Sequence, residues 1–345
     1  MGREDQLIKE LARAVPSAIG PRKVRQSSLA GVRLGIGDDA AVIVPGRNVD
    51  LVVTCDSFLD GVHFLANRHP ADSVGYKSLA RATSDVAAMG GTPRFFLLTL
   101  AIPQAFTNTW LSTFLDGVRR AARELGLVLI GGDTTRSTSA ALSITVLGEV
   151  ASGRAITREG ARPGDILYVS GTLGRAHLGL ELIRNCPAKA VTGFLRDQSG
   201  LLQQHLYPKI RLKLGQWLSK HRSASSMIDI SDGLSTDLGH LCAASEVGAR
   251  LWAARIPLVR IPASQSKLAH KLRLNPLRMA LHGGDDYELL FSVPRRLAKR
   301  LESAPAFRDI TAIGEIETGR RILLVDAGGR TEALRPGGWD PFRNR

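Results

Sequence analysis

Short apolar or glycine-rich runs of this chain repeatedly carry aspartate, and this repetition is its most informative feature. The runs read GIGDDAAVI, LVVTCD, TSDVAAMGG, LVLIGGDTTR, MIDISDGL and HGGDDYELL. Two carboxylates about 4 Å apart repel each other by roughly 4 kcal/mol at an effective dielectric constant near 20, so a cluster of them requires cations. Carboxylate oxygens favour Mg²⁺ or Ca²⁺ over zinc, and Mg²⁺ usually arrives with substrate phosphates. The pattern predicts a magnesium-dependent enzyme that handles a nucleoside triphosphate.

Taken singly, most of these acids also have an ordinary structural explanation. Asp56 could cap the turn after its strand, which we expect to be buried and to end there, and Asp85 could pair with Arg81 one helical turn earlier. Asp232 could be the N-cap of a helix. Asp229 lies inside an apolar strand and needs a partner to be buried at all. Their convergence in glycine-rich contexts of both halves favours a shared function.

Two of the runs place glycines where a phosphate could approach. The turn Gly35–Gly37 lets the backbone present Asp38 and Asp39, although these acids could also be turn caps. A GxGxxA dinucleotide fingerprint is formally present there, but its acids would stand where the pyrophosphate should bind, which excludes that reading. We expect Asp133 to follow a strand across Gly131 and Gly132, whose amides could approach a phosphate.

Other enzyme signatures are missing from the sequence. It contains no GxxxxGK[ST] loop, no GxSxG or HExxH motif and no protein-kinase set. His63, just after the Asp56 strand, could contact a substrate or simply be a packed histidine.

The elements that position these acids suggest a mixed α/β protein with two domains divided near residue 150. The boundary carries Gly153, Gly160 and Pro163-Gly164. Helices are expected at 7–15, 72–89, 108–125, 209–221 and 232–245, and strands at 41–44, 51–54, 95–102, 127–130, 142–150, 166–170, 227–230 and 249–256. Asp72 is the expected N-cap of the second helix.

Composition narrows the class of protein. The 345 residues carry 46 Lys and Arg against 32 Asp and Glu, a net charge of +14. The arginines are scattered, so a nucleic-acid-binding protein is only an alternative, and a basic exterior would also attract nucleotides. Three cysteines without a CxxC pair, no apolar run of ~18 residues and no signal-peptide core favour a cytoplasmic protein without a membrane anchor.

With these residues in view, the chain resembles the thiamine-monophosphate kinase family, in the superfamily of aminoimidazole ribonucleotide synthetase and selenophosphate synthetase. The motifs GIGDDAAV, SDVAAMGGTP, LIGGDTTR, IDISDGLSTDLGHLC and GGDDYEL carry the resemblance from about Leu34 to Trp339. It implies transfer of the ATP γ-phosphate to thiamine monophosphate, giving thiamine diphosphate. A sister ATP-dependent synthetase is the alternative, but residues 1–37 lack the cysteine that selenide chemistry would need.

The resemblance also implies a fold and a division of labour. It implies the two-domain aminoimidazole ribonucleotide synthetase-like α/β (α+β) fold, in which an N-terminal domain (1–150) binds ATP and magnesium and dimerises through a β-barrel. A C-terminal α/β domain (151–345) would complete the active site. The partners would be thiamine monophosphate, ATP and a second copy of the chain, with no nucleic acid and no membrane.

The family motifs assign roles to individual residues. Several Mg²⁺ ions would be held by Asp39, Thr54, Cys55 (through its backbone), Asp56, Asp85, Asp133, Asp229 and Asp232, with Asp39, Asp56, Asp85 and Asp133 as the catalytic acids. ATP would contact Gly132, Asp133, Arg158 and Ser231, and thiamine monophosphate would contact His63, Asp285 and Trp339. The family more often reads Ser-Thr-Asp at Thr54–Asp56 and GGEDYEL at the last motif, so Asp285 is shorter than the usual acid by one methylene.

Overall fold

The computed structural model describes residues 31–34, 41–187, 200, 202–263, 266–304, 307–340 and 342. It divides into two compact units, the first up to Val86 and again from Gly91 to Gly153, the second comprising Ala87–Gly90 and the chain from Arg154 onward. The expected mixed α/β class is confirmed, because each unit combines a β-sheet with helices. The helix expected at 7–15 and the turn carrying Asp39 lie outside the described residues.

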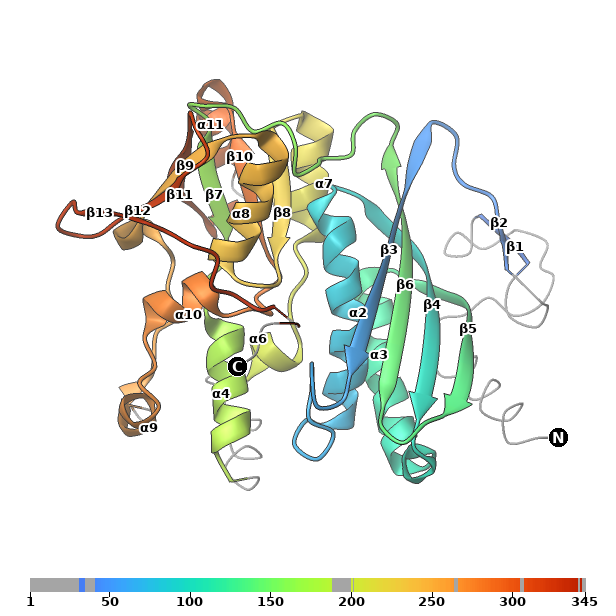
Figure 1. Ribbon diagram of the computed structural model, residues 1–345. Coiled ribbons are helices and arrows are strands. Elements are labelled where there is room, and N and C mark those ends of the chain that lie inside the picture. Colours follow the sequence, from blue (N-terminus) through green and yellow to red (C-terminus); the bar gives the residue numbers. More distant parts are fainter. Residues whose placement is uncertain are drawn as a thin grey trace. The chain divides into compact units, whose positions relative to one another are not determined.

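The first unit is built on a four-stranded sheet in the order β3-β6-β4-β5. Its strands are β3 (Val49–Leu59), β6 (Ala141–Ala151), β4 (Thr92–Ile102) and β5 (Val128–Arg136). Only the β4–β5 pair is parallel among these three pairings. Figure 1 shows α2 (Ala71–Ala88) and α3 (Thr109–Leu125) together behind this sheet. The short β1 (Val32–Leu34) and β2 (Val42–Ile43) pack on the other face, against Phe95 and Ile130.

Two glycines let α2 and α3 approach closely. A Cβ atom on Gly117 would lie 1.8 Å from the carbonyl oxygen of Asp72, and one on Gly75 would lie 2.0 Å from that of Phe114. The helix α2 begins at Ala71, so Asp72 lies in its first turn and is not the predicted N-cap. An acid in the first turn still complements the helix dipole.

Two strands of the first unit extend beyond their predicted ends. The strand β3 continues past Asp56 to Leu59, and it is not fully buried, because Leu51 is 46% and Val53 is 60% exposed. The strand β5 continues to Arg136, so Asp133 lies inside it. Glycine, aspartate and threonine disfavour strands locally, but pairing with β4 overrides that preference.

The second unit has a seven-stranded sheet in the order β13-β12-β9-β11-β7-β10-β8. The strands are β7 (Ile166–Ser170), β8 (Ser226–Ile230), β9 (Gly248–Trp252), β10 (Glu288–Val293), β11 (Ile310–Glu317), β12 (Ile322–Val325) and β13 (Thr331–Ala333). The helices are α4 (Arg175–Asn185), α6 (Gln203–Leu206), α7 (Leu212–His221), α8 (Leu234–Ser245), α9 (Ser266–Lys271), α10 (Pro276–His282) and α11 (Arg295–Glu302).

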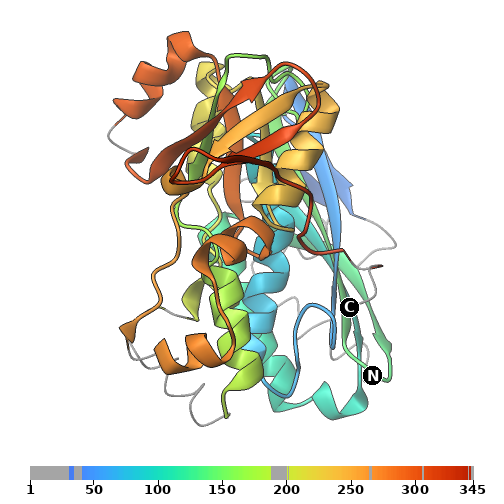
Figure 2. The ribbon, with the colours of Figure 1, turned by 60° about the vertical axis from the view of Figure 1, so that its left-hand side comes forward.

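Two separate apolar clusters hold helices on both faces of this sheet. Residues of α8 and α10 share one cluster with β7 and β9, and residues of α7 and α11 share the other with β10. Figures 1 and 2 show α8 and α11 on opposite sides of the strands. No helix in the described part of the chain is long and apolar enough to cross a membrane.

Candidate functional site

In the first unit, β3 and α2 bring two acids into neighbouring polar contacts. Thr54 and Asp56 lie on the same face of β3, two residues apart. The hydroxyl of Thr54 donates to Asp85 Oδ2 at 2.5 Å, and Arg81 Nε donates to Asp56 Oδ2 at 3.1 Å. Arg81 and Asp85 are one turn apart on α2. This spacing matches that of Asp56 and Thr54 on β3, so each helix residue reaches one strand residue. The sequence placed Thr54, Asp56 and Asp85 in one site, and the structure brings these three together.

Cys55 and His63 extend this part of the first unit. Cys55 is exposed and points to the opposite face of β3 from Asp56, as alternation along a strand requires. His63 Nδ1 accepts the backbone N–H of Leu59 at 3.0 Å, and its ring centroid lies 5.7 Å from that of Phe58. The Nδ1 side of this imidazole is therefore bound to the backbone.

Asp133 lies on the sheet face that α2 and α3 do not cover. Residues directly opposite each other in a ladder point to the same face. Asp133 pairs with Thr99, whereas Gly132 pairs with Leu98, which is buried beneath the helices. Asp56 pairs with the equally buried Ile144, so the sheet of a single chain places Asp56 and Asp133 on opposite faces.

Gly132 is required by its surroundings in the sheet. Its φ is +153°, and a Cβ atom would lie 2.0 Å from a backbone carbonyl oxygen of β4. The adjacent amide of Thr134 donates to the Asp133 carboxylate at 2.9 Å.

In the second unit, three carboxylates converge where β8 passes into α8. Asp229 is buried inside β8, Asp232 follows the strand, and Asp237 is buried in the first turn of α8. Asp237 Oδ2 accepts the backbone N–H groups of Asp232 at 3.1 Å and Gly233 at 3.0 Å. Burial, then the charges of Asp229 and Asp232, raise the pKa of Asp237 well above its usual value. The N-cap of α8 is Gly233, so Asp232 is not the cap that the sequence allowed.

The turn after β8 also anchors two of the predicted substrate-binding residues. The backbone N–H of Asp285 donates to the carbonyl of Ser231 at 2.8 Å, and that of Trp339 donates to the carbonyl of Asp232 at 2.9 Å. Segments far apart in the sequence therefore meet at one turn. Arg158 is exposed on a separate loop, where its carbonyl accepts the Ser245 hydroxyl.

Sequence reasoning missed the partners that hold the last acidic motif. Asp286 is fully buried and accepts the N–H groups of Gly174 at 2.6 Å and Ala176 at 3.1 Å. Burial raises the pKa of Asp286 to about 7, although these hydrogen bonds lower it. Glu288, also buried, binds Arg211 through both carboxylate oxygens. The adjacent acids Asp285 and Asp286 in the motif GGDDYEL could have indicated that one of them is structural.

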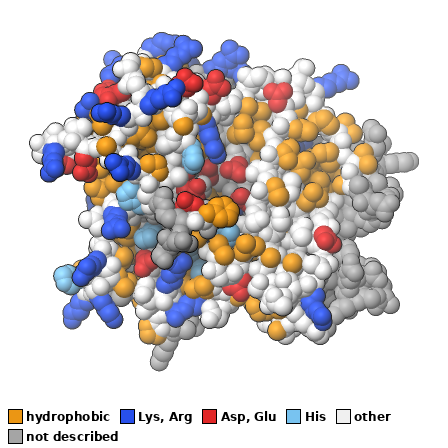
Figure 3. Space-filling view, in the orientation of Figure 1, with side chains coloured by type: hydrophobic (Ala, Val, Ile, Leu, Met, Phe, Trp, Pro, Cys, Tyr) orange, Lys and Arg blue, Asp and Glu red, His pale blue; other side chains and the backbone are white. Residues whose placement is uncertain are grey.

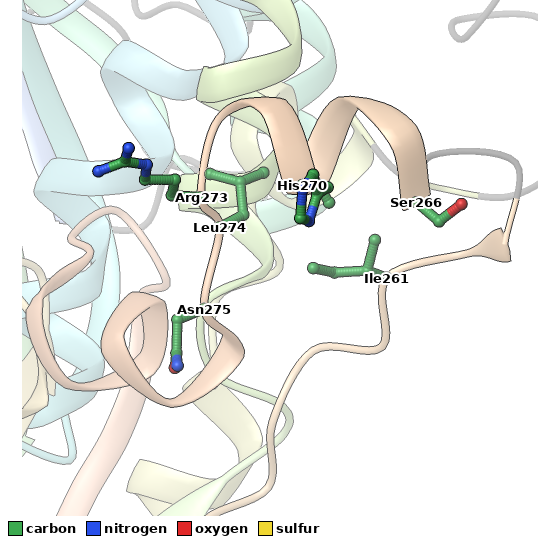
Figure 4. Close-up of a pocket in the computed structure, with 7 residues that line it drawn as sticks. Ile261, Ser266, His270, Arg273, Leu274 and Asn275 are labelled. Carbon is green, nitrogen blue, oxygen red and sulfur yellow. The ribbon is translucent and has the colours of Figure 1, made fainter.

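The predicted residues do not line the cavity of Figure 4. That cavity has a volume of about 750 Å³ and is bounded by Ile261, Ser266, Ala269, His270, Arg273, Leu274 and Asn275. The described residues also contain no group of three or more His, Cys, Asp or Glu side chains spaced to hold a metal ion. Among the predicted metal ligands that the structure describes, Asp56 and Asp85 lie at the β3–α2 contact, Asp229 and Asp232 lie where β8 passes into α8, and Asp133 belongs to neither group.

Comparisons with known proteins place these groups in context. Residues 37–150 match the family AIR synthase related protein, N-terminal domain. The thiamine-monophosphate kinase of Escherichia coli (strain K12) is 38% identical over 322 residues, which are 93% of this chain and 95% of that protein.

Solved structures agree with this similarity. The crystal structure of thiamine-monophosphate kinase from Stenotrophomonas maltophilia K279a is 36% identical with a TM-score of 0.74, covering 85% of this chain and 91% of that one. AaThiL complexed with AMPPCP and TMP is 32% identical with a TM-score of 0.72, covering 89% of this chain and 92% of that one.

Proposed function

This chain belongs to the thiamine-monophosphate kinase family, and from that premise we propose that it transfers the γ-phosphate of ATP to thiamine monophosphate, giving thiamine diphosphate and ADP. The observation that carries the proposal is 38% identity extending over 95% of the Escherichia coli enzyme. The binding of AMPPCP and TMP by AaThiL, 32% identical to this chain, supports the same pair of substrates.

The acceptor explains why acids are needed and a general base is not. A phosphate monoester has its second pKa near ~6, so the attacking oxygen is already ionised at neutral pH. The difficulty is to bring two anions together and align them for in-line transfer. Mg²⁺, when bound, would supply positive charge that offsets this repulsion.

The donor set suits magnesium in its chemistry. Thr54, Asp56 and Asp85 offer hard oxygen atoms in the first unit, and Asp229 and Asp232 offer them in the second. Asp39, the Cys55 carbonyl and Asp133 complete the proposed ligand set. Asp56, Asp85, Asp133 and Asp39 would hold the reacting phosphates in place through these ions.

The substrate contacts follow the same division. Gly132, Asp133, Arg158 and Ser231 would bind ATP. His63, Asp285 and Trp339 would bind thiamine monophosphate. A tryptophan face suits the cationic thiazolium ring.

The exposed face of the four-stranded sheet supports a homodimer. Leu51 and Val53 are exposed on it, and Figure 3 shows hydrophobic side chains gathered over this part of the first unit. Burying such a face is favourable at roughly 25 cal/mol per Å². Asp133 lies on the same face, so a dimer formed here would place a second chain beside it. We assign residues 1–150 to dimerisation and nucleotide binding, and residues 151–345 to completing the active site. We also propose that the protein works in the cytoplasm.

A substrate assay tests the proposal. The purified chain should convert thiamine monophosphate and ATP into thiamine diphosphate, while Asp56→Asn and Asp133→Asn should abolish turnover without unfolding the protein. Near-normal activity of either variant at saturating Mg²⁺ would refute its role. If no thiamine monophosphate is consumed, activity on an amide substrate would support the sister synthetase, and salt-sensitive retention on DNA would support the nucleic-acid alternative.

A further inference from the structure

The segment around Asp285 holds two non-glycine residues in an unfavourable backbone conformation. Asp285 has φ +69° and Tyr287 has φ +50°, on either side of Asp286. Left-handed conformations of such residues persist only where the surroundings enforce them, and they cluster at functional sites. The contacts that this conformation allows could therefore serve a function.

The surroundings do enforce it, through bonds on both sides of the pair. The backbone N–H groups of Asp285 and Tyr287 donate to the carbonyls of Ser231 and Ile230, each at 2.8 Å. Between them, the buried Asp286 carboxylate accepts two backbone amides at the start of α4, those of Gly174 and Ala176, and its carbonyl accepts Gln204 Nε2 at 2.6 Å. The segment cannot relax without breaking these bonds.

The conformation places the Tyr287 hydroxyl on the Asp285 carboxylate. Tyr287 Oη donates to Asp285 Oδ1, two residues earlier in the chain, at 2.8 Å. The second oxygen, Oδ2, lies 3.7 Å from Nδ1 of His205, whose side chain is 1% exposed. The Asp285 side chain itself stays 30% exposed. One oxygen of a solvent-accessible carboxylate is thus held by a hydrogen bond, and the other lies near a buried imidazole.

We propose that Tyr287 is a positioning residue that orients Asp285 toward the cationic end of thiamine monophosphate; this rests on the proposed function. A carboxylate one methylene shorter than glutamate reaches less far, so its direction decides whether it meets the ligand. A hydroxyl donor fixes that direction and stabilises the ionised carboxylate. Trp339, anchored to the next carbonyl of the same turn, would supply the aromatic face beside it.

The test is steady-state kinetics of the full chain carrying Tyr287→Phe, which removes one oxygen atom. We expect KM for thiamine monophosphate to rise about tenfold, the effect of one charge-assisted hydrogen bond, with KM for ATP changed less than twofold. Tyr168→Phe is the matched control, because Tyr168 Oη also donates to a carboxylate, that of Glu302, at 2.7 Å. This control should leave both KM values unchanged.

A double variant separates positioning from a direct contact. If Tyr287 acts through Asp285, then Tyr287→Phe should have no further effect on KM in an Asp285→Asn background. Independent, multiplying effects would overturn the proposal, as would an unchanged KM in Tyr287→Phe alone. A wild-type chain inactive on thiamine monophosphate would overturn the proposed function, and this inference with it.

Discussion

Breaking the pair formed by Arg211 and Glu288 should destabilise the second unit, because it leaves a buried charge without its partner. Arg211 Nε and Nη2 donate to the two carboxylate oxygens of Glu288 at 2.5 and 2.8 Å, and Nη1 binds Asp309. The Glu288 side chain is 4% exposed and that of Arg211 is 23% exposed. Arg211→Met keeps much of the aliphatic stem and removes the charge, which leaves Glu288 with the Ser170 hydroxyl as its remaining described partner.

The size of the effect follows from burial. Removing one partner of a buried ion pair costs about 3–5 kcal/mol, because the other charge remains buried. The partial exposure of Arg211 lets water reach the gap and favours the lower end, about 3 kcal/mol. A domain of 150–250 residues loses roughly 2–4 °C of Tm per kcal/mol, so the melting temperature should fall by roughly 6–12 °C.

Calorimetry of the full chain can test this with a matched control. Arg295→Met removes an arginine from an exposed pair, in which the Arg295 and Glu315 side chains are 65% and 28% exposed. Surface pairs contribute about 0–1 kcal/mol, so this variant should melt within ~4 °C of the wild type. Adding Glu288→Gln to Arg211→Met should recover part of the loss, because the buried charge is gone. Equal shifts in both single variants, or no recovery, would refute the reasoning.

The other predictions concern backbone space, pH and thiol access. Gly132→Ala should destabilise the first unit strongly because its Cβ would clash with a backbone carbonyl, whereas Gly126→Ala, at φ +73° with open space around it, should cost only about 1 kcal/mol in urea unfolding. The raised pKa of Asp286, about 7 when folded against ~3.9 unfolded, means that its contribution to stability is present at low pH and lost as pH rises toward 7. Between pH 5 and 7, the free energy of unfolding of Asp286→Asn should therefore rise relative to that of the wild type by about 2 kcal/mol, and a constant difference would contradict this. In the native protein a thiol reagent should modify exposed Cys55 before Cys242, whose pKa burial raises to about 12; a homodimer formed through the sheet face should slow labelling of Cys55 as protein concentration rises.

Local patterns predicted the elements whose ends are set by local chemistry. The strand at 166–170 was predicted with its observed ends, and the helix before Gly126 ends there because glycine adopts φ +73° readily. The strand β5 was predicted too short, because its second half is held by pairing with β4 and has no apolar pattern of its own. The start of α8 was misplaced by two residues because a distant segment, not a polar cap, fills the space beside Gly233.

The sequence proposes which residues form the candidate site, but it does not give their geometry. The repeated acids point to Asp56, Asp85 and Asp229, and the contact of Thr54 with Asp85 agrees with period-two spacing on β3. The opposite orientation of Asp133 depends on the register between β4 and β5, including an irregularity after Phe96. One inserted residue reverses the face of every side chain that follows, and no composition rule reveals it.

The motif GGDDYEL illustrates why an acid cannot be assigned from type alone. Asp286 is bound by amides about 110 residues earlier, and Glu288 by an arginine 77 residues earlier, so both are satisfied inside the fold. Asp285 is fixed by its own neighbour Tyr287 and keeps a solvent-accessible carboxylate. Burying an acid requires partners that only the folded chain supplies, whereas an acid that serves a ligand must keep part of its surface exposed. Asp286 and Glu288 are therefore structural acids, and the Tyr287 hydroxyl directs Asp285.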